Sequence, residues 1–347
     1  MRAGLVLVTG ASGFVGKWAV VELLRAGFTV RAGIRSEDKV DAVRQAVIAQ
    51  LGEDFLYRLN FAKLNLLFDT GWLRAMLRID AIVHCAGVVL AGEPDKPGRI
   101  IGPAVEGTER VLRFATLAGV RRIVMTSSVA AVAYGHGSLT GVHEFTAGDF
   151  TKIEAIRRPY AACVGATMAE RGAWAYARSE GLDLTTIHPG PILGLALDGD
   201  VSASLQLIAW LLDGSRPRLP GNGVAVVDVR DVAAMLVAAL QQDRAIGQRY
   251  LVASDYVSFS HMGFILAAAF PDWPVGMDVL PDWRVRLSAA FGGPMRSFVH
   301  DLGHEKHFDR SKAEALLGGP LISGRDAIVA AADSLIRFGR VTRVGVP

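Results

Sequence analysis

The fold is decided by the stretch Leu5-Val-Leu-Val-Thr-Gly10-Ala-Ser-Gly13-Phe-Val-Gly16, an apolar strand that runs into three glycines and then into a helical pattern. The glycines permit a tight turn, let the backbone approach a phosphate and let the helix pack close to the strand. The helix N-terminus adds unpaired N–H donors and a partial positive charge. We therefore predict a pyrophosphate cradle for a dinucleotide rather than a glycine-rich turn without a ligand. The predicted contacts are Gly10, Ser12, Gly13, Phe14, Val15 and Gly16.

The composition predicts a globular protein with a large core. The chain has 347 residues, 51% of them hydrophobic, and a net charge of +3 from 37 basic and 34 acidic residues. The basic residues form no run of the kind that binds nucleic acid. Two cysteines, Cys85 and Cys163, indicate neither a disulfide framework nor a metal cluster, which favours a reducing, cytoplasmic location. We expect no signal peptide and no membrane partner, because no apolar run reaches the ~18 residues that span a bilayer.

Strands and helices alternate along the first half of the chain. This alternation predicts an α/β fold with a Rossmann-type, doubly wound parallel sheet and helices on both faces. The expected strands are Leu5–Val8, Thr29–Ile34, Tyr57–Leu64, Ala81–Cys85, Arg122–Thr126 and Leu184–His188. The expected helices are Trp18–Ala26, Lys39–Leu51, Trp72–Leu77, Ala104–Leu117 and Pro159–Ser179.

The rhythm changes after Pro189. A helix over Val226–Leu240 and a strand over Arg249–Ala253 are expected to return to the main sheet, whereas the flanking segments are less regular. We therefore predict a smaller, discontinuous C-terminal substrate lobe. The predicted division is residues 1–189 plus 226–253 for the dinucleotide-binding domain and residues 190–225 plus 254–347 for the substrate-binding lobe.

The tip of the second strand indicates which dinucleotide binds. An acidic residue there would accept a hydrogen bond from the ribose 2′-hydroxyl of NAD, but this tip carries Arg35, with Lys39 nearby. A guanidinium suits a 2′-phosphate, so we predict NADP(H) ahead of NAD(H), against the alternative that Arg35 is a solvated loop residue. Asn65 and Leu66 are expected near the adenine. Ala86 and Gly87 are expected to let the cofactor pass close to the backbone.

Six motifs together resemble one family. They are Val8-Thr-Gly-Ala-Ser-Gly-Phe-Val-Gly16, Pro103-Ala-Val-Glu-Gly107, Arg121-Arg-Ile-Val-Met-Thr-Ser-Ser128, Ala169-Glu-Arg-Gly-Ala-Trp174, Val227-Asp-Val-Arg-Asp231 and Phe308-Asp-Arg-Ser-Lys312. The chain resembles the extended short-chain dehydrogenase/reductases, in the dihydroflavonol 4-reductase-like and bacterial aldehyde reductase branch. The resemblance covers nearly the whole chain and implies an NADP-dependent oxidoreductase that acts on a carbonyl or alcohol group.

The resemblance implies roles for the residues after the fifth and sixth strands. Ser128 matches the serine that binds the substrate carbonyl oxygen in that family; the alternative is a serine that caps a turn. Ser127 is expected to line the cofactor. Pro189, Gly190 and Ile192 match the loop beside the nicotinamide.

The chain departs from the family at the Tyr-x-x-x-Lys pair on the following helix. With Ala169 and Trp174 as anchors, the tyrosine position falls on Ala162 and the lysine position on Ala166. Moving the register to Tyr160 puts Val164 at the lysine position, so it does not restore the pair. Carbonyl reduction needs a hydride and a proton, and this pair supplies the proton in the family. Its loss removes a general-acid contribution of ~10²–10⁴-fold.

Three hypotheses explain the alanines. The chain is an engineered inactive variant of a working reductase, a natural NADP(H)-binding pseudoenzyme with a sensing or structural role, or an enzyme of the same fold with altered chemistry. We favour the first, because the cofactor loop and Ser128 are intact.

The substrate is expected over the nicotinamide, between the sheet and the second lobe. The predicted lining is mostly apolar or aromatic and comprises Val88, Val89, Ala133, Tyr134 and Leu193, with further residues from 200–225. This favours an aldehyde or ketone with a hydrophobic or aromatic body. Homodimerisation through the helices at 104–117 and 159–179 is implied by the resemblance alone.

Histidines near the C-terminus invite a metal interpretation. His300 and His304 would be neighbours on one helix face, but we favour a solvated polar helix and predict no metal site. His84 is predicted to be a packed core histidine. His188 is predicted to support the loop at Pro189.

Overall fold

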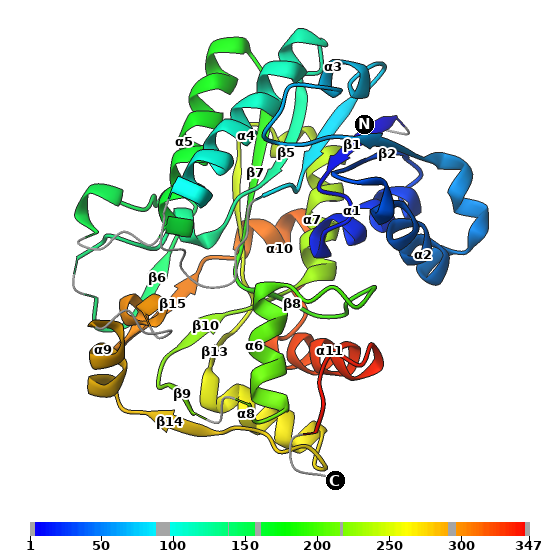
Figure 1. The fold of residues 1–347 in the computed structure, drawn as a ribbon. Coiled ribbons are helices and arrows are strands. Elements are labelled where there is room, and N and C mark those ends of the chain that lie inside the picture. Colours follow the sequence, from blue (N-terminus) through cyan, green and yellow to red (C-terminus); the bar gives the residue numbers. More distant parts are fainter. Residues whose placement is uncertain are drawn as a thin grey trace.

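Seven parallel strands form the central sheet of the computed structural model, which describes residues 4–87, 98–137, 139–156, 161–215, 218–290 and 296–343 (Figure 1). Their order is β12-β7-β5-β4-β1-β2-β3, and every neighbouring pair is parallel. The strands are β1 (Leu5–Thr9), β2 (Thr29–Ile34), β3 (Leu59–Lys63), β4 (Ala81–His84), β5 (Arg122–Thr126), β7 (Asp183–Pro189) and β12 (Arg249–Val252). This arrangement confirms the predicted Rossmann-type doubly wound fold.

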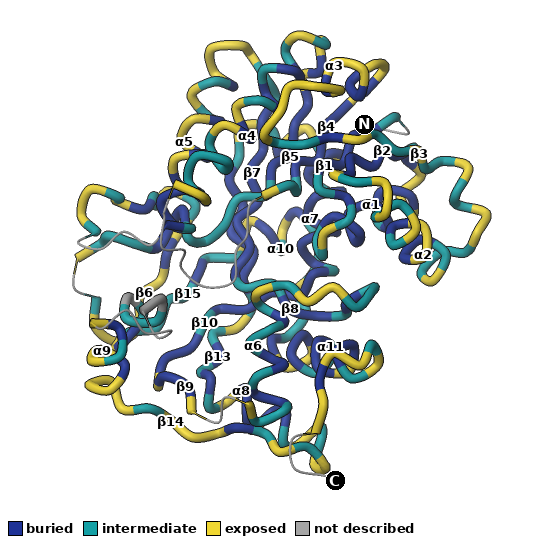
Figure 2. The backbone as a smooth tube through the Cα atoms, in the orientation of Figure 1, coloured by how far each residue is buried: buried dark blue, intermediate teal, exposed yellow. Residues whose placement is uncertain are grey.

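Alternate residues of β1 face opposite cores, which explains why the strand is apolar throughout. Val6 and Val8 pack on the side of the sheet covered by α1 and α7, and Leu7 packs on the side covered by α4 and α5. The helices of the first side are α1 (Phe14–Arg25), α2 (Val40–Leu51), α7 (Val229–Gln241) and α10 (Ser311–Leu317). Those of the second side are α3 (Trp72–Ala75), α4 (Gly98–Leu117) and α5 (Ala161–Glu180). Figure 2 shows the central strands buried between these layers.

A second core lies beside the carboxyl edge of the sheet. It is formed by α6 (Ala203–Leu212), α8 (Phe259–Ala269) and α11 (Gly324–Arg337), with α9 (Asp282–Ala290) farther out. Its short strands are β9 (Arg218–Pro220), β10 (Gly223–Ala225), β13 (Tyr256–Ser258) and β14 (Asp278–Leu280). Residues 254–347 do not all join this core, because α10 packs on α7 and β12. The predicted division into domains stays a prediction.

Two further strand pairs join the lobes. β8 (Ile192–Leu193) pairs in parallel with β11 (Val227–Asp228), and β6 (Gly141–Phe145) pairs in parallel with β15 (His304–Phe308). Figure 1 shows β6 and β15 between the sheet and the second lobe, below α5 in this view. The second pair brings the segment around residue 305 to the carboxyl edge of the central sheet.

Several predicted boundaries differ from the structure. α1 begins at Phe14 rather than Trp18, directly after the glycine turn, and α4 begins at Gly98 rather than Ala104. The predicted helix over Val226–Leu240 begins at Val229, because pairing with β8 makes Val227–Asp228 a strand. Tertiary packing and strand pairing outweigh local propensity at such ends. None of the helices in the described ranges combines the length and apolar character needed to cross a membrane.

Candidate active site

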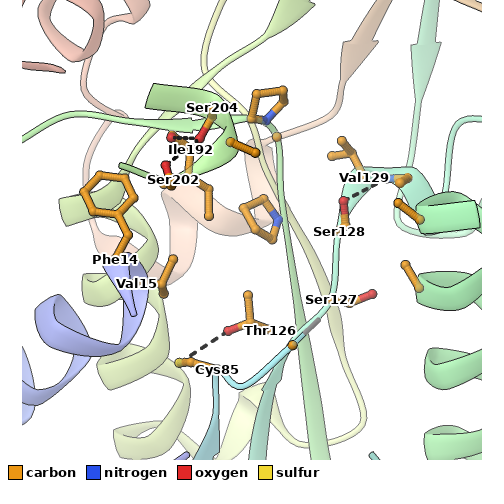
Figure 3. A pocket seen from close by; sticks show the side chains of 18 of the residues that line it. Phe14, Val15, Cys85, Thr126, Ser127, Ser128, Val129, Ile192, Ser202 and Ser204 are labelled. Carbon is orange, nitrogen blue, oxygen red and sulfur yellow. Dashed lines mark hydrogen bonds between the residues drawn. The ribbon is translucent and has the colours of Figure 1, made fainter. Parts of the chain in front are cut away.

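A cavity of about 810 Å³ opens at the carboxyl ends of β1, β4, β5 and β7, against the second lobe. Figure 3 shows Phe14 and Val15 of α1 on one side of it and Ser127 and Ser128 on the other. In open parallel sheets, ligands bind outside the carboxyl ends of the strands. The position of the cavity is therefore the one that the fold assigns to a dinucleotide and its substrate.

Most of the predicted site residues line this cavity. They are Gly10, Gly13, Phe14, Val15, Gly16, Leu66, Ala86, Gly87, Ser127, Ser128, Ala133, Tyr134, Ala162, Ala166, Pro189, Gly190 and Ile192. The tertiary structure thus brings residues from six separate segments to one place. Their roles stay predictions.

The other predicted residues lie elsewhere. Ser12, Arg35, Lys39, Asn65 and Leu193 are not part of the cavity lining. Leu193 is 1% exposed and packs in the second core, so it is unavailable to a substrate. The side chain of Asn65 caps its own turn, because its Oδ1 accepts a hydrogen bond from Leu67 N at 2.9 Å. Val88 and Val89 lie outside the described residues.

The glycine turn has no room for side chains. Gly10 has φ of +68°, and a Cβ there would lie 2.7 Å from Cα of Ala86. A Cβ on Gly16 would lie 2.0 Å from the carbonyl oxygen of Gly10. Gly13 precedes the first residue of α1, and no acidic side chain lies in the first turn. The turn therefore presents backbone N–H groups and the positive end of α1 to the cavity, which fits a pyrophosphate.

Three basic side chains follow the glycine turn and β2. Arg35 follows β2 and is exposed. Lys39 Nζ lies 3.2 Å from Asp200 Oδ2, and the buried Lys17 pairs with Asp198 of the same loop. Of the two residues predicted to meet a 2′-phosphate, Lys39 is thus already in an ion pair. Arg35, the other of the two, is exposed.

Ser128 begins the loop after β5. It caps the short helix Val129–Ala131, and its Oγ accepts a hydrogen bond from Ala130 N at 3.1 Å. This contact uses an acceptor lone pair, and a serine hydroxyl also carries one donor hydrogen. The turn cap and the predicted contact to a carbonyl oxygen are therefore compatible in the same residue.

The face of α5 toward the cavity is formed by alanines. The lining residues from this helix are Ala162, Ala166 and Ala169. Among the described residues of α5, none with an ionisable side chain reaches the cavity. A methyl group neither donates nor accepts a proton, so this face can shape a ligand but cannot carry acid–base chemistry.

A buried polar network holds the loop after β5 to its surroundings. Glu170 of α5 is 0% exposed, and it accepts hydrogen bonds from Arg249 Nε at 2.7 Å and from Ser127 Oγ at 3.2 Å. Nε2 of the buried His188 lies 2.8 Å from Glu170 Oε1. Burial favours a raised pKa for Glu170, but His188 and Arg249 outweigh it and lower the pKa to about 2. Sequence reasoning missed this network, although the motif that contains Glu170 was one of the six.

A second wall of the cavity comes from residues that sequence reasoning did not assign to the site. It comprises Tyr256, Asp301, His304 and Lys306, which join the predicted Tyr134. Lys306 pairs with Asp301, and its Nζ lies 3.5 Å from the centroid of the Tyr134 ring. Burial and the charge of Lys306 lower the pKa of His304. No sequence signal places these residues at the site, because Tyr256 comes from β13 and the other three from β15 and the segment just before it, far along the chain.

The predicted polar helix around His300 and His304 is wrong. Residues 304–308 form strand β15, held by parallel pairing with β6. The described residues include no group of three or more side chains that would hold a metal ion.

The structure confirms His84 as a packed core histidine. It is 3% exposed, its Nδ1 lies 2.7 Å from Thr9 Oγ1, and burial lowers its pKa to about 4. Burial also raises the pKa of Cys85 to about 12 and that of Cys163 to about 11, so neither thiol is an activated nucleophile near neutral pH.

The fold and cavity define a nucleotide-binding α/β enzyme scaffold, and comparison with known proteins specifies the family. A family model described as "NAD dependent epimerase/dehydratase family" matches residues 6–253. The chain belongs to this family, as an extended short-chain dehydrogenase/reductase of the dihydroflavonol-reductase-like branch.

Curated relatives and solved structures support the assignment. The chain is 34% identical to cinnamoyl-CoA reductase 1 of Petunia hybrida over 78% of this chain and 79% of that protein. It is 31% identical to dihydroflavonol 4-reductase of Zea mays over 78% of this chain and 76% of that protein. The fold is similar to the yeast methylglyoxal/isovaleraldehyde reductase Gre2 complexed with NADPH, with a TM-score of 0.77, 23% identity and coverage of 97% and 100%.

Proposed function

We propose that this protein is an NADP(H)-dependent reductase scaffold for a hydrophobic or aromatic aldehyde or ketone, disabled at the positions that normally supply the proton. The observation that carries the proposal is a single cavity with a complete glycine cradle at one end, Ser128 in its wall and only alanines on the α5 face. When bound, NADP(H) would supply or accept a hydride at its nicotinamide ring.

The choice of NADP(H) rests on Arg35 and on the relatives. Arg35 is exposed beside the cradle, where a guanidinium would pair with a 2′-phosphate. The similar yeast reductase was solved with NADPH. Gly10, Gly13 and the first turn of α1 would hold the pyrophosphate, and Pro189, Gly190 and Ile192 would flank the nicotinamide.

The residues near the reacting carbonyl would orient it without a strong acid. The Ser128 hydroxyl would donate a hydrogen bond to the carbonyl oxygen, and the Glu170 network holds the neighbouring Ser127 in place. Hydride transfer creates an alkoxide, which needs positive charge or a proton nearby. Ala162 and Ala166 offer neither, so reduction at this face is expected to be slow.

A natural NADP(H)-binding pseudoenzyme is the second candidate, favoured by the continuous alanine face of α5. An engineered loss of activity is favoured by the intact cradle and Ser128. A natural gene with tyrosine and lysine at positions 162 and 166 would favour the engineered variant, and a natural gene with alanine at both would exclude it. An enzyme of the same fold with altered chemistry is the third hypothesis.

The test compares the chain with an Ala162→Tyr/Ala166→Lys variant. Both are titrated with NADPH and NADH, and NADPH oxidation is followed with benzaldehyde, cinnamaldehyde, isobutyraldehyde and acetophenone. We expect both proteins to bind NADPH, and the variant to turn over a carbonyl ~10²–10⁴-fold faster. NADPH binding with no turnover in either protein would favour the pseudoenzyme. No NADPH binding in either would contradict the proposal.

Two finer predictions belong to this proposal. The first is a homodimer through α4 and α5, tested by light scattering on the purified protein. The second is a cytoplasmic location, in keeping with the free thiols of Cys85 and Cys163.

A further inference from the structure

A phenol and an ammonium group lie together in the same cavity as the alanine face of α5. Lys306 Nζ lies 3.5 Å from the centroid of the Tyr134 ring, and the Tyr134 hydroxyl donates to Asp301 Oδ2 at 3.5 Å. Lys306 also pairs with Asp301, and the side chains of the pair are 12% and 17% exposed. The Lys306 ammonium that faces Tyr134 is therefore partly desolvated, and its charge is balanced by Asp301.

Hydrogen bonds tie the backbone of Tyr134 to the first turn of α5. Tyr134 N donates to Thr151 Oγ1 at 3.1 Å, and Thr151 Oγ1 donates to Ala130 O at 2.8 Å. The thiol of Cys163, the neighbour of Ala162, donates to the same Ala130 oxygen at 3.2 Å. Tyr134 is thus anchored next to the helix turn that carries the lost tyrosine position.

The electrostatic effects of Lys306 and Asp301 on Cys163 also place these two charges near the start of α5. The charge of Lys306 lowers the pKa of the Cys163 thiol and that of Asp301 raises it, against a larger rise from burial. Both charged groups therefore lie close enough to the start of α5 to act on it. Lys306 lies on β15 and Tyr134 in the loop after β5, so this pair reaches the cavity from elements other than α5, which carries the family's pair.

Other proton donors in the described lining are less suited to the task. Burial lowers the pKa of His84 to about 4 and raises that of Cys85 to about 12. Burial raises the pKa of Tyr256 to about 12. The Lys306 ammonium favours ionisation of the phenol by stabilising a phenolate, whereas the Asp301 carboxylate that accepts the Tyr134 hydrogen bond opposes it.

We propose that Tyr134, assisted by Lys306, delivers the proton for the residual carbonyl reduction of this chain in place of the side chains missing at Ala162 and Ala166. This inference rests on the proposed function. When bound, the cofactor would supply a hydride for the new C–H bond as the carbonyl π bond breaks, which would leave an alkoxide and oxidised cofactor. The Tyr134 O–H bond then breaks, its proton joins the alkoxide to give the alcohol, and the phenolate takes a proton from water. Tyr134 is the donor, whereas Lys306 stabilises the phenolate and Asp301 positions Lys306.

The kinetic test uses the full chain, its Tyr134→Phe and Lys306→Met variants, and Tyr176→Phe as a matched control on the outer part of α5. We expect the starting chain to turn over slowly. Tyr134→Phe should lower kcat by ~10²-fold or more with KM within a few-fold, and Lys306→Met should lower kcat less. Tyr176→Phe should change neither constant.

The Ala162→Tyr/Ala166→Lys background sharpens this result. There the restored helix pair supplies the proton, so adding Tyr134→Phe should change kcat only a few-fold. An equal loss in both backgrounds would mean that Tyr134 shapes the pocket instead of donating the proton, and would overturn the inference.

A second readout needs neither cofactor nor substrate. In protein labelled with ¹³C at the tyrosine ζ carbon, the signal absent from Tyr134→Phe reports the ionisation of Tyr134. Lys306→Met should raise the pH at which this signal titrates, because the phenolate loses its cation. Asp301, His304 and the Cys163 thiol also face this region, so Asp301→Asn is expected to lower that pH. An unchanged titration in Lys306→Met would overturn the role of Lys306.

The outcomes separate the inference from the proposed function. A silent starting chain whose Ala162→Tyr/Ala166→Lys variant is active would overturn the inference and leave the proposed function standing. Turnover that survives Tyr134→Phe would overturn the inference alone. Silence in both backgrounds with NADPH bound would overturn both.

Discussion

The two ends of the cavity differ in what lines them, which is backbone at one end and side chains at the other. The cradle end consists of backbone, with Gly10 and Gly16 held so tightly that a single methyl group would overlap a neighbour. The α5 end consists of side chains, and at Ala162 and Ala166 they are reduced to methyl groups. Backbone geometry depends on the whole fold, whereas a side chain can be lost while the helix remains. A cavity can therefore keep its backbone geometry while the side chains beside it vary.

The Glu170 network lies between these two ends and gives the largest expected effect. Glu170→Gln removes the negative charge that faces Arg249 and His188, all of them buried. Removing one member of a buried charge pair costs about 3–5 kcal/mol, so the melting temperature should fall strongly. Thermal unfolding of the two proteins measures the loss. Glu154→Gln, at an exposed ion pair with Arg171, is the matched control and should change little.

The same network predicts how stability depends on pH. The pKa of Glu170 is lowered to about 2 from its usual 4.5, so its stabilisation is complete above about pH 4.5 and is lost as the pH falls toward 2. The stability difference between the chain and Glu170→Gln should therefore shrink over this range. A difference that stays constant from pH 6 to pH 2.5 would show that ionised Glu170 is not what stabilises the fold.

Gly16→Ala should break the cradle end alone. The added Cβ would lie 2.0 Å from Gly10 O, so the turn must open. We expect a stability loss of about 1–3 kcal/mol and a fall in NADPH affinity of at least about tenfold. Calorimetric titration with NADPH measures the affinity. Gly172→Ala, at an open position of α5, should leave binding intact and add slight stability.

Arg35→Ala should change which dinucleotide the cradle prefers. A charge-assisted contact to the 2′-phosphate would be lost, which weakens NADPH binding by about 10- to 100-fold and leaves NADH binding unchanged. Titration with both nucleotides measures the ratio. The control is Arg44→Ala, an exposed arginine of α2 in an ion pair with Asp41. Equal weakening of both nucleotides would remove Arg35 from the specificity argument.

Lys39→Met gives the smallest expected effect. The Lys39 side chain is 38% exposed and its ammonium group is already paired with Asp200, and such surface pairs contribute little. We expect NADPH affinity to change by less than about fivefold. A loss as large as that of Arg35→Ala would mean that Lys39 leaves Asp200 to bind the cofactor.

Much of the cradle end was predictable because its signals are local. The strand at Leu5, the glycine spacing and the tip at Arg35 each lie within a short stretch, and the parallel sheet forms as their alternation predicts. The departure from the family's Tyr-x-x-x-Lys pair at Ala162 and Ala166 could also be predicted, because the resemblance aligns these positions through Ala169 and Trp174. The predicted ends of helices and strands were less accurate, because strand pairing such as that of β8 with β11 overrides local propensity.

The fold class and the glycine turn could be predicted from the sequence, and the resemblance placed alanines at two positions of α5. Which other residues share the cavity lining with these alanines became visible in the folded chain alone. Tyr134 and Lys306 are far apart in the chain. Lys306 reaches the Tyr134 ring because β15 pairs with β6 at the carboxyl edge of the sheet. Hydrophobic periodicity in the sequence indicates which face of a helix or strand is buried, whereas the pairing of distant strands cannot be predicted from any single stretch.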